Sequence, residues 1–229
     1  MPSPIAVRAS ACVAPPATTA GLPEIVDHVG RTWSPGFVPD TRSNAALLLL
    51  ASCGGNNTAP RNLDDACSIV AQRPAYLRAM KRTERRWGVP VNVQMATIYQ
   101  ESKFIGNART PFRYALGIIP MGRQSSAYGY SQAIDSTWED YRRANGRFGA
   151  KRNRIEDATD FMGWYMDSTE KKLGIPKYDA TAHYLAYHEG HSGYARGSYN
   201  EKAWLMRVAA EVGQRSETYR VQLARCGKL

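Results

Sequence analysis

Glu101 ends a segment whose apolar residues repeat with the period of an α-helix. Val91, Met95 and Ile98 fall at i, i+4 and i+7, so they form one stripe on a helix that Pro90 is suited to begin. The carboxyl group of Glu101 lies three residues further along that stripe. A carboxyl group beside core-facing residues is partly desolvated, which favours its neutral form and suits a general acid. A solvated or ion-paired glutamate at a helix end is the alternative.

Aromatic residues gather in the segment 105–135, which has no helical period. They are Phe112, Tyr114, Tyr128 and Tyr130. Irregular segments longer than about 12–15 residues are uncommon in compact domains and are usually functional or mobile. Aromatic faces among amide and hydroxyl groups suit sugar rings, and they suit nucleic-acid bases as well. A loop packed by its own aromatic side chains is the alternative.

Helices must position these groups, because the sequence carries no long alternation of β-branched residues. The chain has 229 residues, 43% of them hydrophobic, which is enough for one core and a tail. The expected fold is a single compact all-α domain with strands at most minor. Gly88, Gly146, Gly174 and Gly213 are expected to end helices. Helices are predicted at about 64–72, 75–87, 91–103, 136–145, 156–173, 179–188 and 200–214, with a further short helix to 224.

A formal net charge of +10 predicts attraction to an anionic partner such as nucleic acid, a lipid surface or a negatively charged polymer. Basic residues concentrate in two runs, which are Arg78, Lys81, Arg82, Arg85 and Arg86, and then Arg142, Arg143, Arg147, Lys151, Arg152 and Arg154. Nucleic-acid binding is therefore a rival hypothesis. No recognised DNA- or RNA-binding motif accompanies either run, so we predict no nucleic-acid partner.

The first part of the chain has the pattern of an export leader. Residues 1–44 are rich in proline, alanine, threonine and serine without periodicity, and we expect them to be unstructured. The apolar run 45–53 is too short to span a bilayer and suits an export signal, with a short buried helix as the alternative. Its last residues, Leu50 to Cys53, resemble the lipobox of bacterial lipoproteins, in which the cysteine is lipidated. The expected organisation is a leader over 1–52, a flexible tether over 53–63 and a folded domain over 64–229.

The lipobox interpretation also sorts the four cysteines. Cys12 would lie in the removed leader and Cys53 would carry lipid, which leaves Cys67 and Cys226 near the two ends of the domain. In an oxidising periplasm this pair could form a disulfide that contributes up to about 4–5 kcal/mol by chain entropy. Two unpaired thiols are the alternative. No CxxC motif or Cys/His cluster suggests zinc, so we predict no metal and no cofactor.

Three short motifs follow one another along the chain. They are Glu101-Ser102, then Ala127 to Ala133 (AYGYSQA), then Ala186 to Gly190 (AYHEG). They resemble the motifs of the lysozyme-like soluble lytic transglycosylases, which are a Glu-Ser at a helix end, a Gly-Leu-Met-Gln and an Ala-Tyr-Asn-x-Gly. The resemblance covers about residues 75–212 and rests on order and spacing. The chain departs from it by lacking the central Leu-Met pair and by carrying His188 in place of asparagine, which puts fine substrate preference in doubt.

The resemblance implies a lysozyme-like fold with a substrate groove, and a lyase that acts on peptidoglycan. Family members cleave the β-1,4 bond between N-acetylmuramic acid and N-acetylglucosamine and leave a 1,6-anhydromuramyl end. Glu101 would protonate the glycosidic oxygen and then, once ionised, accept a proton from the C6 hydroxyl group of the sugar. A lysozyme-type hydrolase of the same bond and a non-catalytic peptidoglycan-binding lipoprotein are the alternatives.

The same resemblance implies substrate-binding residues. They are Ser102, Tyr130, Gln132, Tyr187 and His188, and each also has a purely structural alternative. Glu189 is a candidate second carboxylate, which would permit hydrolysis, but we expect it to be a solvated charge at a helix end. We expect a monomer whose partner is the glycan strand, held in the periplasm by a lipid on Cys53. Gly54 lacks the acidic character that commonly retains lipoproteins in the inner membrane, so the outer membrane of a Gram-negative bacterium is favoured.

Overall fold

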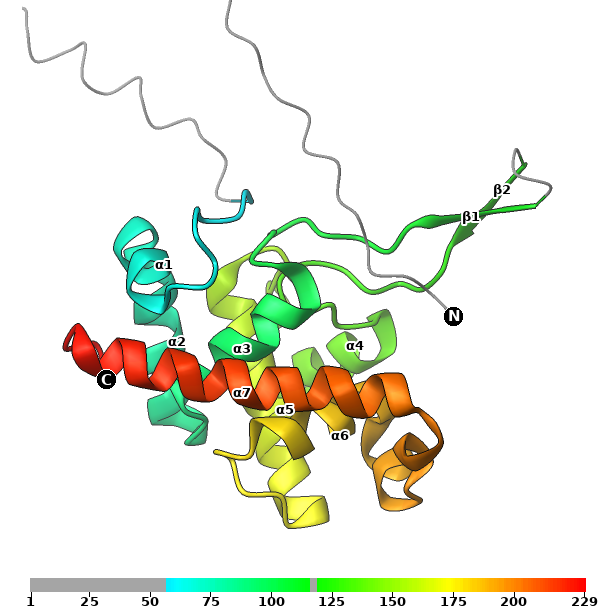
Figure 1. Cartoon of the computed structure of the whole chain (residues 1–229). Helices are drawn as coiled ribbons and strands as arrows, with labels where there is room; N and C mark the ends of the chain where they lie inside the picture. The colour runs from blue at the N-terminus through cyan, green and yellow to red at the C-terminus, as the bar shows by residue number, and fades with distance from the viewer. Residues whose placement is uncertain (1–56, 116–118) are drawn as a thin grey trace, which may run out of the picture. The chain divides into compact units, whose positions relative to one another are not determined.

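The computed structural model describes residues 57–115 and 119–229 (Figure 1). Its elements are α1 (Ala66–Gln72), α2 (Pro74–Trp87), α3 (Val91–Ser102), β1 (Phe112–Ala115), β2 (Ile119–Arg123), α4 (Asp135–Asn145), α5 (Ile155–Leu173), α6 (Ala180–Ala195), the 3-10 helix η2 (Ser198–Glu201) and α7 (Ala203–Arg225). The prediction of a helical domain with minor strands is confirmed. Within these residues no helix combines the length and the apolar character needed to cross a membrane.

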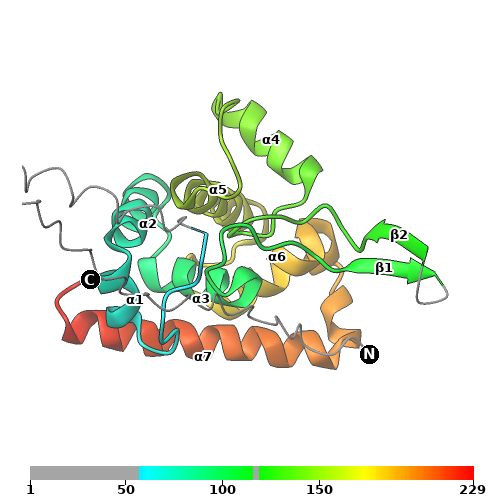
Figure 2. The same cartoon turned by 90° about the horizontal axis from the view of Figure 1, so that it is seen from above.

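Helix α3 lies at the centre of the domain and contacts α2, α5, α6 and α7 (Figure 2). Every residue from Val91 to Ile98 is buried, so the predicted apolar stripe is part of a wider buried surface. The side-chain amide of Gln94 donates to the carbonyl oxygens of Met80 and Val89 at 3.0 and 2.8 Å. Because buried polar groups are costly unless they are hydrogen-bonded, these bonds allow a helix with polar residues to occupy the core.

Three of the four glycines that were expected to end helices do so. Gly88, Gly146 and Gly174 follow α2, α4 and α5 with φ angles of 73°, 63° and 70°, a region that glycine adopts without a steric penalty. The prediction for Gly213 is wrong, because α7 continues through it to Arg225. A β-carbon at Gly213 would lie 2.1 Å from Thr181 Oγ1. The glycine therefore serves close packing of α7 against α6.

The segment 105–135 contains a two-stranded antiparallel hairpin, formed by β1 and β2, that the sequence pattern did not predict. Phe112 pairs with Arg123 and Ala115 with Ile119. The hairpin projects away from the helices (Figures 1 and 2). Its side chains Phe112 and Met121 are 46% and 66% exposed. Strands are recognised in a sequence by an alternating apolar face that packs on a core, and the exposure of Phe112 and Met121 leaves no such signal at these two positions.

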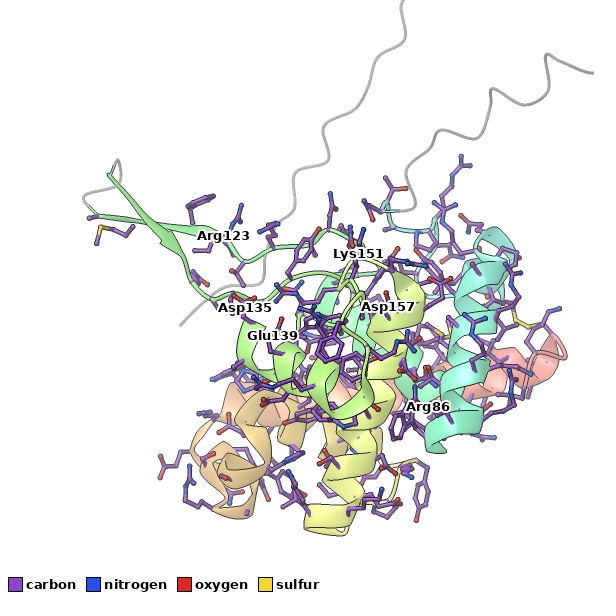
Figure 3. All side chains as sticks on the ribbon, turned by 180° about the vertical axis from the view of Figure 1, so that it is seen from behind. Arg86, Arg123, Asp135, Glu139, Lys151 and Asp157 are labelled. Atoms are coloured by element: carbon purple, nitrogen blue, oxygen red, sulfur yellow. A yellow bond between two sulfur atoms is a disulfide. The ribbon has the colours of Figure 1, made fainter. Side chains whose placement is uncertain are left out.

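Most residues of the second basic run form ion pairs with nearby carboxylates, of which Asp135, Glu139 and Asp157 are labelled in Figure 3. At the start of α5, an Arg147 nitrogen lies 2.7 Å from an Asp157 oxygen, and Arg86 of the first run lies 2.9 Å from Asp160. Further ion pairs join Arg142 to Glu139, Arg143 to Asp140 and Arg152 to Asp135. On α2, by contrast, the side chains of Arg78, Arg82 and Arg85 are exposed. The attraction of this part of the protein to anions therefore comes mainly from α2.

Residues 57–63 have no helix or strand, but they are attached to the domain. The carbonyl oxygen of Asn57 accepts a 2.9 Å hydrogen bond from the Gly106 N–H group, and the Tyr219 hydroxyl donates to the carbonyl oxygen of Leu63. Pro60 is buried. The prediction of a flexible tether over 53–63 therefore does not hold from Asn57 onward. The remaining tether residues, the leader over 1–52 and the predicted lipidation site Cys53 lie outside the described residues.

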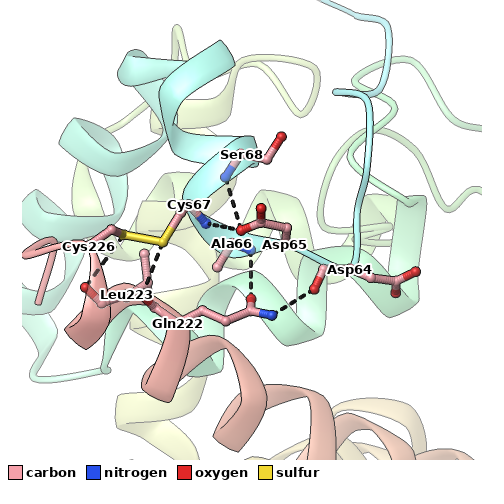
Figure 4. The surroundings of a disulfide bond; sticks show 8 residues. All are labelled: Asp64, Asp65, Ala66, Cys67, Ser68, Gln222, Leu223 and Cys226. Atoms are coloured by element: carbon pink, nitrogen blue, oxygen red, sulfur yellow. Dashed lines mark hydrogen bonds between the residues drawn. A yellow bond between two sulfur atoms is a disulfide. The ribbon is translucent and has the colours of Figure 1, made fainter.

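A disulfide joins Cys67 in α1 to Cys226 directly after α7, which confirms the predicted pairing (Figure 4). The two cysteines are 159 residues apart in the sequence, so the bond closes nearly the whole domain into one loop. Gln222 strengthens the same junction, because its side-chain carbonyl accepts from the Ala66 N–H group at 2.8 Å and its amide donates to the Asp64 carbonyl at 2.9 Å. The two ends of the domain are thus held together covalently and by hydrogen bonds.

Candidate active site

Glu101 lies in the last turn of α3 and is partly buried. Burial raises the pKa of its carboxyl group from 4.5 to about 7, although a hydrogen bond from Tyr184 and the positive charge of Lys103 act in the opposite direction. Desolvation raises the pKa because it penalises the ionised form, and here it is the largest of the three effects. The carboxyl group therefore exchanges its proton near neutral pH, as an acid that must first give and later accept a proton requires.

Gln132 belongs to the second motif, Ala127 to Ala133, and its side chain holds the loop of that motif together. Its amide nitrogen donates to the carbonyl oxygens of Gly129 at 2.8 Å and Ala108 at 3.0 Å. Its φ angle is 49°, a left-handed conformation that is uncommon for residues other than glycine. Strained backbone of this kind persists only where surrounding contacts enforce it. In this conformation the amide nitrogen is used by the loop, which leaves the side-chain oxygen as the group able to meet a ligand.

Ser102 and Tyr130 are placed in the core, not on an open surface. Ser102 is 5% exposed, and its hydroxyl oxygen lies 2.8 Å from the carbonyl oxygen of Tyr130. Tyr130 is 1% exposed, and its hydroxyl group is 3.0 Å from that of Tyr76. The prediction that these two side chains bind substrate is therefore not supported by their placement. They instead fix the loop of the second motif against the end of α3.

Helix α6 contacts both the end of α3, where Glu101 lies, and the loop of the second motif. The Tyr187 hydroxyl donates a 2.5 Å hydrogen bond to the carbonyl oxygen of Ser131, within the second motif. One turn earlier, Tyr184 reaches the carboxyl group of Glu101. Burial raises the pKa of both tyrosines, so their hydroxyl groups remain neutral donors. The three motifs that are far apart in the sequence therefore meet at one place.

Tyr184 is the site residue that the sequence analysis missed. It lies three residues before Tyr187 and thus on the same face of the helix, and that spacing was the available signal. The helix also continues beyond the predicted end at 188 to Ala195, with a kink at Gly190 whose φ and ψ are 71° and 161°. The glycine of the third motif therefore allows α6 to change direction directly after the residues that face Glu101.

His188 and Glu189 lie just before this kink and contact each other, with 2.9 Å between Nδ1 and Oε1. The exposed His188 ring also meets Trp204 edge to face at 5.2 Å between centroids. Glu189 forms a 2.7 Å ion pair with Lys202, and hydrogen bonds from Lys202 and Ser198 lower its pKa to about 2. Its side chain is 4% exposed, so the expectation of a solvated charge is wrong. Both carboxylate oxygens of Glu189 are already engaged by Lys202, Ser198 and His188, which favours a structural role beside the kink over that of a second catalytic carboxylate.

The described residues hold no cluster of three His, Cys, Asp or Glu side chains that is arranged to bind a metal ion. The fold and the site define a helical domain in which one desolvated acid meets a strained glutamine loop and a tyrosine-bearing helix. A family model for the transglycosylase SLT domain matches residues 42–226, and the chain belongs to this family. The resemblance found in the three motifs is thus confirmed, and peptidoglycan glycan is the substrate class that the domain implies. A search of curated proteins finds no match to the chain.

Proposed function

We propose that this protein is a peptidoglycan lytic transglycosylase that cleaves the bond between N-acetylmuramic acid and N-acetylglucosamine and forms 1,6-anhydromuramyl ends. The observation that carries the proposal is the environment of Glu101. Burial brings the pKa of this carboxyl group to about 7, and Tyr184 and the Gln132 loop lie beside it. Family membership and the net positive charge, which suits a polymer bearing carboxylates, support the same assignment.

In the first step the protonated Glu101 gives its proton to the glycosidic oxygen as the bond to the muramyl C1 breaks. The leaving sugar gains a hydroxyl group, and the positive charge that develops at C1 is stabilised by the N-acetyl oxygen of the same muramyl ring. In the second step the oxygen of the C6 hydroxyl group bonds to C1, and the Glu101 carboxylate accepts the proton that this hydroxyl group loses. The acid is regenerated, and no water is consumed. Exclusion of water from C1 favours ring closure over hydrolysis.

The decisive variant is Glu101→Gln, which retains the shape of the side chain and removes the exchangeable proton. On purified sacculi it should lose release of anhydro-muropeptides by about 10³-fold or more while it still binds the wall. Glu201→Gln, at an exposed glutamate of η2, is the matched control and should digest at the parental rate. Digestion by Glu101→Gln at the parental rate would refute the assignment of the acid.

The products that the parent protein releases from sacculi distinguish a transglycosylase from a hydrolase and from a non-catalytic wall-binding protein. Mass spectrometry of the released ends distinguishes an anhydro end from a reducing end, because the anhydro end lacks one water. Reducing ends would assign the protein as a hydrolase. Binding to sacculi without release of fragments, at any pH between 5 and 8, would assign it as a non-catalytic wall-binding protein.

We also propose that the mature protein is a monomer, lipid-anchored through Cys53 on the periplasmic face of the outer membrane. The lipobox-like sequence supports the anchor, and the Cys67–Cys226 disulfide is of the kind that persists in an oxidising compartment. Fractionation of cells that express the parent and Cys53→Ser tests the anchor. The variant should move from the membrane to the soluble periplasmic fraction, and no change would exclude lipidation at this residue. Light scattering of the detergent-solubilised protein checks the monomer.

A further inference from the structure

A pocket of about 350 Å³ lies between α3 and α7, beside the candidate acid. The residues that define its chemistry are Asp64, Tyr99, Gln100, Lys103, Glu211 and Arg215. Gln100 precedes Glu101 in the chain, and the Tyr184 hydroxyl interacts with both of these side chains. The pocket and the acid are therefore neighbours on the same turn of α3, although the pocket contributes nothing to the proposed two-step chemistry.

Two positive groups of the pocket face one aromatic ring. The ammonium nitrogen of Lys103 lies 3.6 Å from the centroid of the Tyr99 ring, and the guanidinium carbon of Arg215 lies 3.5 Å from it. Arg215 has a carboxylate partner, Asp64, at 2.8 Å. Lys103 forms no ion pair with any of the described residues. Burial and the charge of Arg215 lower the pKa of Lys103 to about 8 although the nearby carboxylates of Glu211, Glu101 and Asp64 act in the opposite direction, so an anion bound directly to this ammonium group would stabilise its charged form.

The backbone holds Lys103 in this place. Lys103 and Phe104 have φ angles of 50° and 60°, two successive left-handed residues that are not glycine. Such residues cost on the order of 1 kcal/mol each, and they persist where the surroundings enforce them. Phe104 is fully buried and stacks on Tyr76 at 5.8 Å between centroids. The backbone from which the Lys103 side chain leaves is thus fixed by the core, and the ammonium group lies over the Tyr99 ring.

We propose that this pocket binds one carboxylate group of the peptide that muramic acid carries, through the charges of Lys103 and Arg215. The inference rests on the proposed function, because it assigns the muramyl ring to the Glu101 site. That ring bears the peptide on its own lactyl group, so the peptide leaves the strand within one sugar ring of the acid. Asp64 and Glu211 line the same pocket and repel anions of higher charge. The pocket therefore favours a single carboxylate over a phosphate or a nucleic-acid backbone.

Binding by the full-length chain carrying Glu101→Gln tests the proposal without turnover. Calorimetry is used to compare the N-acetylglucosaminyl-N-acetylmuramyl disaccharide with and without its peptide. The peptide should strengthen binding about tenfold or more, as expected for a charge-assisted contact, and Lys103→Met in the same background should remove the gain. Lys81→Met, at a lysine of α2 that is also partly exposed, should retain it. Arg215→Met should reduce it.

Turnover of intact glycan strands and of strands stripped of peptide by an amidase gives the second measurement. The charge of Lys103 also influences Glu101, but this effect is common to both substrates and cancels in the ratio of their kcat/KM values. The ratio should fall in Lys103→Met through KM. Equal binding of the two disaccharides, or an unchanged ratio, would overturn the proposal. Peptide-dependent binding that requires Lys103, in a parent that cleaves neither substrate, would support the pocket and refute the proposed function.

Discussion

The Tyr187 hydroxyl group donates a 2.5 Å hydrogen bond to the carbonyl oxygen of Ser131, across 56 residues of sequence. The bond ties α6 to the loop of the second motif, and Tyr184 on the same helix face reaches Glu101. A single helix thus fixes the distance between the acid and the loop. The proposed mechanism depends on that distance, because in it Glu101 reaches first the glycosidic oxygen and then the C6 hydroxyl group.

Removal of this hydroxyl group should lower both the stability and the activity of the protein. Tyr187→Phe leaves the Ser131 carbonyl without its donor, which should cost about 1–2 kcal/mol of unfolding free energy. It should also lower kcat/KM on sacculi by about tenfold or more, since the loop loses its attachment beside Glu101. Tyr165→Phe is the control, because its hydroxyl donates to the Ala186 carbonyl at 3.2 Å and not to the loop. Equal activities of the two variants would contradict this role.

The activity should decline as the pH rises above about 7. The first step requires protonated Glu101, and burial sets the pKa of this group at about 7, so kcat/KM should fall about tenfold per pH unit on the alkaline side. Initial rates on sacculi between pH 5 and 9 measure this alkaline limb, which is the falling part of the pH–rate profile. Because the charge of Lys103 lowers the pKa of Glu101, Lys103→Met should move the limb to higher pH. A limb that begins near pH 4.5 would mean that Glu101 is solvated.

Glu101 should reduce the stability of the protein at neutral and alkaline pH. The pKa of Glu101 is about 7 in the folded protein, whereas the ordinary value of 4.5 applies to the unfolded chain. As the pH rises, the unfolded chain therefore loses this proton first. Stability therefore falls between about pH 4.5 and 7 and then levels off, by on the order of 3 kcal/mol. Glu101→Gln should remove this loss. In urea unfolding it should be more stable than the parent at pH 8 and similar at pH 4, whereas a constant difference would contradict the assigned burial.

Gly213→Ala should destabilise the protein even though alanine favours helices. The helix propensity gained is about 1 kcal/mol, whereas a β-carbon 2.1 Å from Thr181 Oγ1 forces α6 and α7 apart. We expect a net loss of about 1–3 kcal/mol by thermal or urea unfolding. Thr181→Ala should relieve much of it in the double variant. Gly149→Ala is the control, because a β-carbon there would have no neighbour within 4 Å.

Removal of the disulfide should lower stability without changing the active site. The Cys67–Cys226 bond closes a loop of 159 residues, so the double variant Cys67→Ser, Cys226→Ser should lose about 2–5 kcal/mol in urea unfolding. Neither cysteine contacts Glu101 or the loop of the second motif. The kcat/KM of folded protein at low temperature should therefore match the parent, and an inactive but fully folded double variant would contradict this separation.

Features that depend on neighbouring residues or on an ordered set of motifs were predictable. The apolar stripe that leads to Glu101 repeats within one helix, and the glycines at 88, 146 and 174 act on the helices that they follow. The pairing of Cys67 with Cys226 followed from the small number of cysteines left in the domain. Each of these inferences needs only the local chain or a count.

The predictions that were wrong depend on contacts between residues of different elements of the fold. Gly213 looked like a helix end until Thr181 was placed beside it, and Glu189 looked solvated until Lys202 was paired with it. Tyr130 was expected to bind the sugar substrate, but its ring is buried in the core and packs edge to face on Tyr76. Spacing within one segment carries no information on such partners.

The sequence by itself determined the helical class of the domain and its family, and it singled out Glu101 as the candidate acid, because helical periodicity and ordered motifs are properties of the chain alone. Only the tertiary structure decided that the candidate acid is desolvated, that Tyr184 and Tyr187 join it to the Gln132 loop, and that Lys103 lines a pocket beside it without an ion pair to any described residue. The physical reason is that burial and electrostatic environment depend on what the rest of the chain brings to a residue.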